Sequence, residues 1–170
     1  LRSSGILQIF LTSIGAAASY LPGSEIYPAL ASGVMDGAHW GAVQGSASMK
    51  FYDVNKYHMR PAINVAGTDI WLVNQKAFAE LPEDIQKILV ITLEEHFWLR
   101  TNQYIYLENK TLSKVQKEQG VELITLPPEE YAKMQIAALK IWDEVAQKGP
   151  HCAKAVDMLK DFNRQMGRIK

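Results

Sequence analysis

The chain has 170 residues, of which 48% are apolar and 21% charged, proportions usual for a globular protein of one medium domain or for part of a two-domain protein. Its 18 basic and 18 acidic residues cancel, which argues against nucleic acid or an acidic membrane surface as a main partner. The single cysteine, Cys152, excludes an internal disulfide and a cysteine-rich zinc site.

The first elements along the chain alternate between helix and strand. Apolar residues at helical spacing predict a helix over residues 3–14. Residues 16–21 are short, small and apolar, and they predict a buried strand. A second helix is expected over 24–32, with Ser24 as its N-cap, Pro28 in its first turn and Gly33 as its end. This alternation favours an α/β fold.

The middle of the chain contains the longest predicted helix. Residues 41–50 are rich in Gly, Ala, Ser and Gln and predict a loop or a weakly formed helix. Residues 59–73 predict one long strand or two strands with a bend, and a short helix is expected over 74–81. Pro82 then begins a helix that runs to Gln119 and would be about 57 Å long if straight. A helix of that length must kink, span two lobes or pack against a partner.

The C-terminal part is predicted to be helical after one strand. Residues 121–127 alternate in the manner of a strand, and an amphipathic helix follows over 128–148. Gly149 and Pro150 end that helix, and another is expected over 151–166.

The beginning of the chain and its apolar runs bear on its location. The chain opens with Leu1-Arg2-Ser3-Ser4, without an initiator Met or the n-region of a signal peptide. We interpret it as a processed chain or a fragment. Its longest mainly apolar run, 88–93, is far shorter than the roughly 20 residues of a membrane-spanning helix.

The stretch 36–40, Asp-Gly-Ala-His-Trp, follows a predicted helix and has no helical period. Ligands of open α/β folds tend to bind at loops between elements. Trp40 is a candidate for stacking on a small planar substrate, and its backbone carbonyl is a candidate ligand for a cation. The alternative is that Trp40 is an ordinary half-buried aromatic and His39 a satisfied polar residue.

Two further residues are candidates for recognising an anion or a metal. Arg2 stands just before a predicted helix, where its guanidinium can grip a carboxylate with two parallel hydrogen bonds; the alternative is a solvated terminal arginine. Asp69 interrupts an apolar strand, and a buried acid needs a partner or a metal; the alternative is an edge strand with Asp69 facing water. His151 and Cys152 do not form a nucleophile and base pair, because adjacent helical residues do not face each other.

Several ordered motifs then point to one family. They are "FLTSIG", "LPGSEIYPALASGVMDGAHW", "FYDVNKY" and "WLVNQKAFAELPEDIQKIL". Together with Arg2, they resemble the extracytoplasmic solute receptors of TRAP transporters, the DctP-like family. Within them, G-x-E-I-Y-P-A-L-x-x-G-x-x-D-x-x-x-W resembles the branch that binds 2-oxo and 2-hydroxy monocarboxylates. The resemblance runs from residue 2 to the C-terminal helices.

The resemblance implies a periplasmic binding protein and not an enzyme. Two α/β lobes close on a small carboxylate, which is then delivered to the membrane permease. Family members are about twice as long, so this chain resembles their C-terminal half, without the N-terminal half and the signal peptide. Residues 1–60 would form a cleft-lining lobe segment, and 61–126 the crossing strand and a long helix that links the lobes. Residues 127–170 resemble the extended C-terminal helices through which some members form homodimers.

The resemblance also suggests roles for individual residues. Arg2 falls on the arginine that grips the ligand carboxylate, and Trp40 falls on a matching ligand contact. His39 stands where the metal-using branch has a glutamate, and Asp69 lies near the second acid of that branch. Calcium and sodium prefer carboxylate and carbonyl oxygens to imidazole. We therefore expect His39 to donate a hydrogen bond to the ligand in place of the cation; a sodium or calcium ion held by Trp40 and Asp69 is the alternative.

Two other classes of function compete with a receptor. A truncated receptor half could act only as a helical module for dimerisation or interaction. An enzyme would use His39, Asp69 or Cys152, but the sequence shows no paired base and nucleophile.

Overall fold

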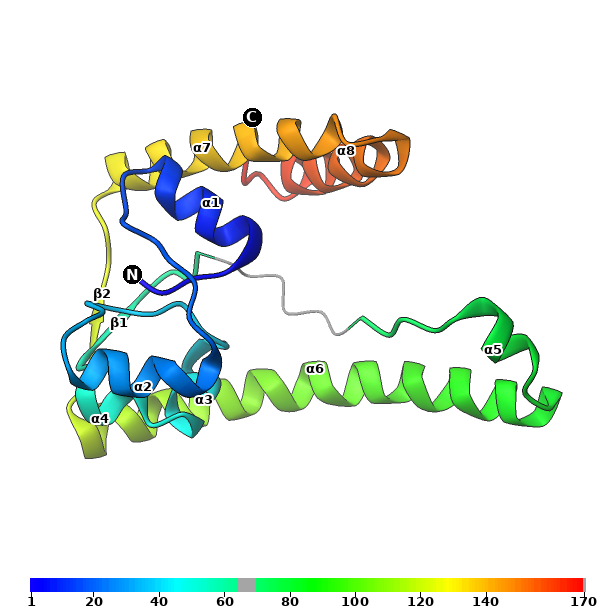
Figure 1. The fold of residues 1–170 in the computed structure, drawn as a ribbon, viewed down its shortest axis with the longest axis horizontal. Helices are drawn as coiled ribbons and strands as arrows, with labels where there is room; N and C mark the ends of the chain where they lie inside the picture. The colour runs from blue at the N-terminus through cyan, green and yellow to red at the C-terminus, as the bar shows by residue number, and fades with distance from the viewer. Residues whose placement is uncertain (64–69, 170) are drawn as a thin grey trace. The chain divides into compact units, whose positions relative to one another are not determined.

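The structure is a computed structural model that describes residues 1–63 and 70–169. Within these residues it contains eight helices and two short strands (Figure 1). In chain order they are α1 (Gly5–Ser13), α2 (Gly23–Ala31), α3 (Ala42–Ser48), α4 (Phe51–Val54), β1 (Tyr57–Met59), α5 (Gln75–Ala79), α6 (Glu83–Gln119), β2 (Glu122–Ile124), α7 (Pro128–Ala146) and α8 (Pro150–Gln165). Among the described helices, none combines the length and the apolar character needed to cross a bilayer.

The chain divides into two compact units. Unit 1 comprises residues 1–39 and 126–170, and unit 2 comprises residues 40–125. The C-terminal helical segment, predicted to begin at residue 127, starts close to a unit boundary, whereas the predicted segment 1–60 is divided between the two units. The roles expected for the three predicted segments stay predictions.

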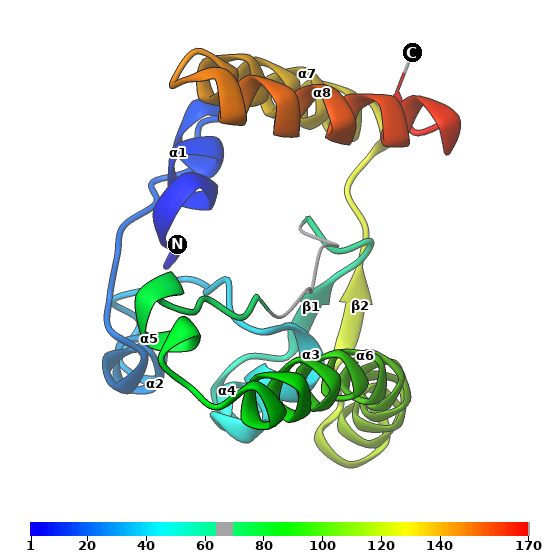
Figure 2. The same cartoon turned by 90° about the vertical axis from the view of Figure 1, so that its right-hand side faces the viewer.

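In unit 1, α7 and α8 pack together as a helical hairpin, and α1 packs against α7 (Figure 2). The hairpin turns at Gly149, whose φ of 155° is readily accessible only to glycine, and Pro150 then begins α8. Both helices were predicted from the sequence. The buried apolar side chains of unit 1 are Phe10, Leu11, Ile26, Met134, Ile141 and Val156.

The helix α2 begins one residue earlier than predicted. Pro22 occupies its N-cap position with a φ of −55° and an extended ψ of 150°. The prediction that Ser24 is the N-cap is therefore wrong, because Ser24 lies inside the helix. Pro28 consequently falls in the second turn and not in the first.

The predicted buried strand over 16–21 is wrong. Arg2 forms single parallel bridges to Ser19 and to Ala38, and neither bridge extends into a strand. Around the first of these, the main-chain N–H of Ser19 donates to the carbonyl of Leu1 at 3.0 Å. A strand needs a neighbour along several residues to satisfy its backbone groups, and each bridge here involves one pair. Even so, these bridges place Arg2 between two segments distant in sequence.

In unit 2, α6 is an uninterrupted helix of 37 residues, as predicted. At 1.5 Å per residue it is about 55 Å long. Its sequence contains no Gly or Pro, and Gly120, with a φ of 66°, ends it in a left-handed conformation. Its C-terminal part contributes Val115 and Leu112 to a core with Val43, and α3 packs there. Of the two alternatives expected over 41–50, a loop or a weakly formed helix, the structure has a helix, α3.

The two strands form a parallel pair. Residue His58 of β1 lies opposite Leu123 of β2, and the chain between the two strands includes α6, a parallel crossover typical of α/β proteins. The strand predicted over 121–127 is confirmed in β2. The strand, or two strands with a bend, predicted over 59–73 is wrong at 60–63 and at 70–73. Neither stretch has regular structure, β1 ends at Met59, and Leu72 is 92% exposed. Residues 64–69 lie outside the described part of the chain.

Candidate functional site

Arg2 is almost completely buried, with 6% of its surface exposed. Its Nε donates a hydrogen bond to the carbonyl of Leu21 at 3.0 Å, and its Nη1 donates to the carbonyl of His39 at 3.0 Å. Its main-chain N–H donates to the carbonyl of Gly37 at 2.9 Å, and its own carbonyl accepts from the N–H of His39 at 2.8 Å. These bonds fix both the backbone and the guanidinium. The alternative of a solvated terminal arginine is therefore wrong.

Two contacts that orient the Arg2 guanidinium are with neutral backbone carbonyls. Carbonyl oxygens at Leu21 and His39 accept its hydrogen bonds without cancelling its charge. The Cζ atom lies 5.7 Å from the centroid of the Tyr20 ring, within the range of a cation–π contact. A buried and oriented guanidinium is well suited to bidentate recognition of a carboxylate.

His39 is close to this cation. Burial, and then the positive charge of Arg2, lower the pKa of the His39 imidazole below its usual value. The ring is therefore neutral at pH 7, with one N–H that can donate and one nitrogen that can accept. A neutral ring beside Arg2 leaves the arginine as the cationic group of this pair.

Trp40 begins unit 2 and packs there. Its ring lies 6.2 Å from the ring of Phe51 at 71°, an edge-to-face contact. A Cβ at Gly45 would come within 3.3 Å of the Trp40 ring, so a glycine gives this side chain its room. The half-buried position of Trp40 agrees with the ordinary aromatic contact that the sequence left open. Its carbonyl, proposed as a cation ligand, accepts a hydrogen bond from the N–H of Ala42 at 2.9 Å.

The segment after Trp40 is held by the carboxylate of Glu108, a residue that was not predicted from the sequence. Glu108 of α6 accepts from the N–H of Val43 at 2.7 Å and from the N–H of Gln44 at 3.0 Å. It therefore caps α3 from another helix and satisfies two amides that no helical carbonyl can reach. Arg60 Nη2 lies 3.4 Å from the same carboxylate.

A second polar pair missed by the sequence lies beside this carboxylate. The hydroxyl of Tyr52 and Nδ1 of His58 are 2.9 Å apart. Burial raises the pKa of Tyr52 to about 12, and burial, followed by the charge of Arg60, lowers the pKa of His58. Both side chains are thus neutral at pH 7 and share a hydrogen bond within unit 2.

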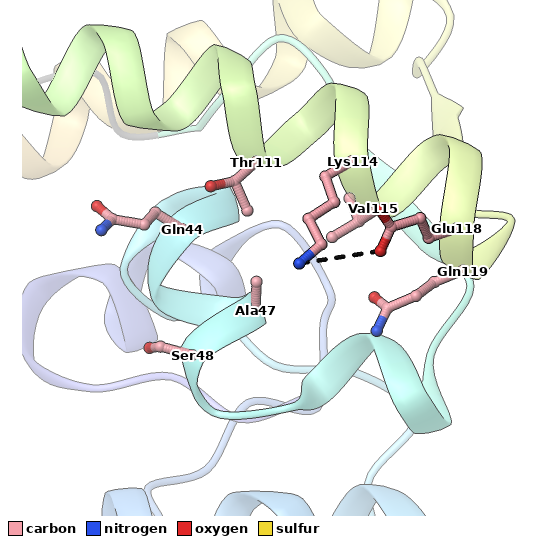
Figure 3. A pocket seen from close by; sticks show the side chains of 8 residues that line it. All are labelled: Gln44, Ala47, Ser48, Thr111, Lys114, Val115, Glu118 and Gln119. Atoms are coloured by element: carbon pink, nitrogen blue, oxygen red, sulfur yellow. Dashed lines mark ion pairs between the residues drawn. The ribbon is translucent and has the colours of Figure 1, made fainter.

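A shallow pocket of about 300 Å³ lies between α3 and the end of α6 (Figure 3). Lys114 and Glu118 at its wall form an exposed ion pair of 3.8 Å. Such a pair adds little stability. The residues that line it are Gln44, Ala47, Ser48, Thr111, Lys114, Val115, Glu118 and Gln119. Arg2, His39 and Trp40 are not among them.

The structure thus brings together two of the four predicted site residues. Arg2 and His39 are in contact in unit 1, Trp40 lies in unit 2, and Asp69 lies outside the described residues. Over residues 1–63 and 70–169, no three His, Cys, Asp or Glu side chains are grouped to hold a metal ion. The predicted involvement of Asp69 in a metal site is not tested by this arrangement.

Comparisons with known proteins show which proteins this chain is similar to. Residues 1–148 match bacterial extracellular solute-binding protein, family 7, which also bears the name DctP. A monocarboxylate 2-oxoacid-binding periplasmic protein of Nostoc sp. is 25% identical over 167 residues, which are 98% of this chain and 46% of that protein.

Two solved TRAP periplasmic solute-binding proteins have a similar fold. One, from Chromohalobacter salexigens with bound (S)-2-amino-1-propanol, is 27% identical with a TM-score of 0.79, over 98% of this chain and 52% of its own. Another, from Pseudoalteromonas atlantica with bound sodium and pyruvate, is 25% identical with a TM-score of 0.77, over 97% of this chain and 50% of its own. The predicted fold, part of a periplasmic binding protein, is confirmed by these similarities.

The chain spans about half the length of these relatives. The matching family consists of solute-binding proteins and not of enzymes, in agreement with the sequence prediction. The match over residues 1–148 shows that the chain belongs to family 7 of the bacterial extracellular solute-binding proteins, the DctP family of TRAP transporter receptors.

Proposed function

We propose that this chain binds a small carboxylate, a 2-oxo or 2-hydroxy monocarboxylate, as part of a periplasmic receptor that delivers its ligand to a TRAP membrane permease. The observation that carries the proposal is the buried guanidinium of Arg2, fixed by carbonyls at residues 21 and 39. The family does not by itself select this ligand class, since one relative holds an amino alcohol and another holds pyruvate.

In this proposal the carboxylate of the ligand pairs with Arg2. The charged and hydrogen-bonded pair is strong because both groups are removed from water and the guanidinium is already oriented. His39, neutral at pH 7, donates its N–H to the 2-oxo or 2-hydroxy oxygen. Trp40, assigned to the ligand by the family resemblance, remains a candidate contact.

The sodium ion beside pyruvate in one relative supports a second version of the site. A sodium or calcium ion would there bridge ligand and protein through Trp40 and Asp69. We favour binding without an added ion, because His39 replaces the acidic residue with an imidazole, a poor ligand for both ions.

The test is a calorimetric titration of the 170-residue chain with pyruvate and lactate. Arg2→Ala is expected to weaken binding by about 2–5 kcal/mol, at least about 30-fold, because the ligand carboxylate would be buried without its partner. Arg168→Ala, a change at an exposed arginine of the same unit, serves as the matched control and should bind normally. Circular dichroism checks the folding of each variant, and Arg2→Lys, which retains the charge without the planar fork, is expected to bind weakly.

The outcomes separate the competing functions. Unchanged affinity in a folded Arg2→Ala variant would contradict the proposal. A strict requirement for sodium or calcium, abolished by dialysis and restored by the ion, would favour the metal-bridged version. Absence of binding by the wild-type chain would favour a module for dimerisation or interaction alone.

A further inference from the structure

The chain makes a tight turn immediately after Trp40. The main-chain N–H of Ala42 donates to the carbonyl of Trp40 at 2.9 Å, and Gly41 between them has a φ of −72° and a ψ of 63°. These angles are those of an inverse γ-turn. The helix α3 begins at Ala42, so the turn joins the backbone of Trp40 directly to that helix.

Ala42, the first residue of α3, has a strained backbone. Its φ is 55°, in the left-handed region that residues other than glycine rarely adopt. Such a conformation persists only where the surrounding contacts hold it, and it is frequent at ligand-binding sites. A contact that fixes the start of α3 is therefore required.

The carboxylate of Glu108 supplies that contact from α6. It accepts from the N–H groups of Val43 and Gln44, the two residues that follow Ala42, at 2.7 and 3.0 Å. The side chain of Glu108 is only 13% exposed, and Arg60 Nη2 lies 3.4 Å from its Oε1. Hydrogen bonds from backbone N–H groups to a carboxylate are among the stronger ones. Because one carboxylate holds two adjacent amides, the start of α3 is fixed against α6.

The ring of Trp40, at the other end of the turn, rests on α3 and α4. A Cβ on Gly45 would lie 3.3 Å from Cδ1 and 3.7 Å from Nε1 of the ring. The ring also makes an edge-to-face contact with Phe51, with the centroids 6.2 Å apart. The pyrrole edge of Trp40 therefore rests on a helix whose own start depends on Glu108.

We propose that Glu108 and Gly45 are positioning residues for the ring of Trp40 in the ligand site. Glu108 holds the strained turn through the amides that follow it, and Gly45 leaves the space that sets where the indole ring lies. Neither residue contacts the ligand, and each acts through the position of the ring. This inference rests on the proposed function, in which Trp40 is a candidate ligand contact.

The fluorescence of Trp40 tests the positioning without a ligand. The chain has four tryptophans, so Trp40 becomes the single fluorophore when Phe replaces the others, which are Trp71, Trp98 and Trp142. In this background Glu108→Ala is expected to raise the acrylamide quenching constant at least about twofold, because the turn is no longer held. Glu118→Ala, at an exposed glutamate of the same helix, is the matched control and should leave the quenching constant unchanged. Circular dichroism checks that each variant is folded.

The affinity for pyruvate tests what the position of the ring is for. In a calorimetric titration, Gly45→Ala and Glu108→Ala are each expected to bind about threefold to tenfold more weakly, because a displaced or mobile ring must be ordered as the ligand binds. Alanine favours a helix interior more than glycine does, so Gly45→Ala should unfold at no lower urea concentration than the wild-type chain. A purely structural role would not weaken binding in a variant of undiminished stability. Ser48→Ala, at an exposed position of α3, is the control and should bind pyruvate normally.

The outcomes separate this inference from the proposed function. If the wild-type chain binds pyruvate through Arg2, whereas Gly45→Ala and Glu108→Ala bind as tightly as the wild-type chain, the proposed function stands and the positioning inference is overturned. Unchanged quenching of Trp40 in Glu108→Ala would likewise overturn the role of Glu108. If the wild-type chain does not bind pyruvate, or if Arg2→Ala binds it equally well, the proposed function fails and this inference fails with it.

Discussion

Arg2 and His39 are the two predicted site residues that the structure brings into contact. The sequence placed both among the candidates, because arginine suits carboxylates and His39 lies in a stretch without helical period. It did not predict that Arg2 would be buried, since its acceptors are carbonyls 19 and 37 residues away. Glu108 was missed for the same reason: it serves the amides of Val43 and Gln44 from 65 and 64 residues away.

His39 makes the stability of the fold depend on pH. Its folded pKa is below the unfolded value, so as pH falls through the unfolded value the unfolded chain takes up a proton that the folded chain does not. The free energy of unfolding should therefore decrease on acidification below about pH 6.5. His39→Gln retains the backbone contacts to Arg2. Urea unfolding at pH 7.5 and 5.5 should show a smaller loss of the free energy of unfolding on acidification in this variant than in the wild-type chain.

His58 provides an independent comparison, because its pKa is also lowered and it lies in unit 2. His58→Gln should remove a separate part of the acid destabilisation, and the two effects should add. Identical pH dependence in the wild-type chain and in both variants would contradict this account.

At the scale of elements, helices were predicted far better than strands. The sequence of α6 contains no Gly or Pro between its ends, and a left-handed Gly120 stops it, so its limits were predicted to within one residue. The strands expected at 16–21 and through 70–73 were wrong because a strand requires a neighbour along its length, and apolar alternation does not show whether one exists. The short α3 was left open, since its N-terminus depends on Glu108.

Glu108, which belongs to α6, is expected to stabilise α3 by capping its N-terminus. Its side chain is 13% exposed and accepts two backbone N–H groups. Glu108→Ala should lower the free energy of unfolding by about 1–3 kcal/mol, because both amides lose their acceptor, and Glu108→Gln, which keeps one oxygen, should lower it less.

A second glutamate of the same helix provides the control for this measurement. Glu118 is 63% exposed and forms a surface pair with Lys114, so Glu118→Ala should change stability by no more than about 0.5 kcal/mol. Urea unfolding monitored by circular dichroism compares the three variants. Equal effects of Glu108→Ala and Glu118→Ala would mean that the carboxylate does not cap α3.

At the scale of the whole molecule, the order of motifs along the chain was enough to predict the family and the fold. The division into a unit of residues 1–39 with 126–170 and a unit of residues 40–125 was not predicted, because it depends on which helices pack together. The exposed face of α8 was not predicted from the sequence for a related reason. Its apolar spacing is the same as that of a core-facing helix, and only the structure shows that Val156 and Lys160 take the inner position.

The central claim is that the charge of Arg2 recognises a carboxylate. The most direct measurement is a calorimetric titration of the chain with pyruvate and, in parallel, with methyl pyruvate, in buffer free of sodium and calcium. The two compounds share the 2-oxo group and differ in the charged carboxylate. We expect saturable binding of pyruvate and binding of the ester that is at least about tenfold weaker, because the ester cannot form the charged pair. Equal affinity for both compounds would contradict the account.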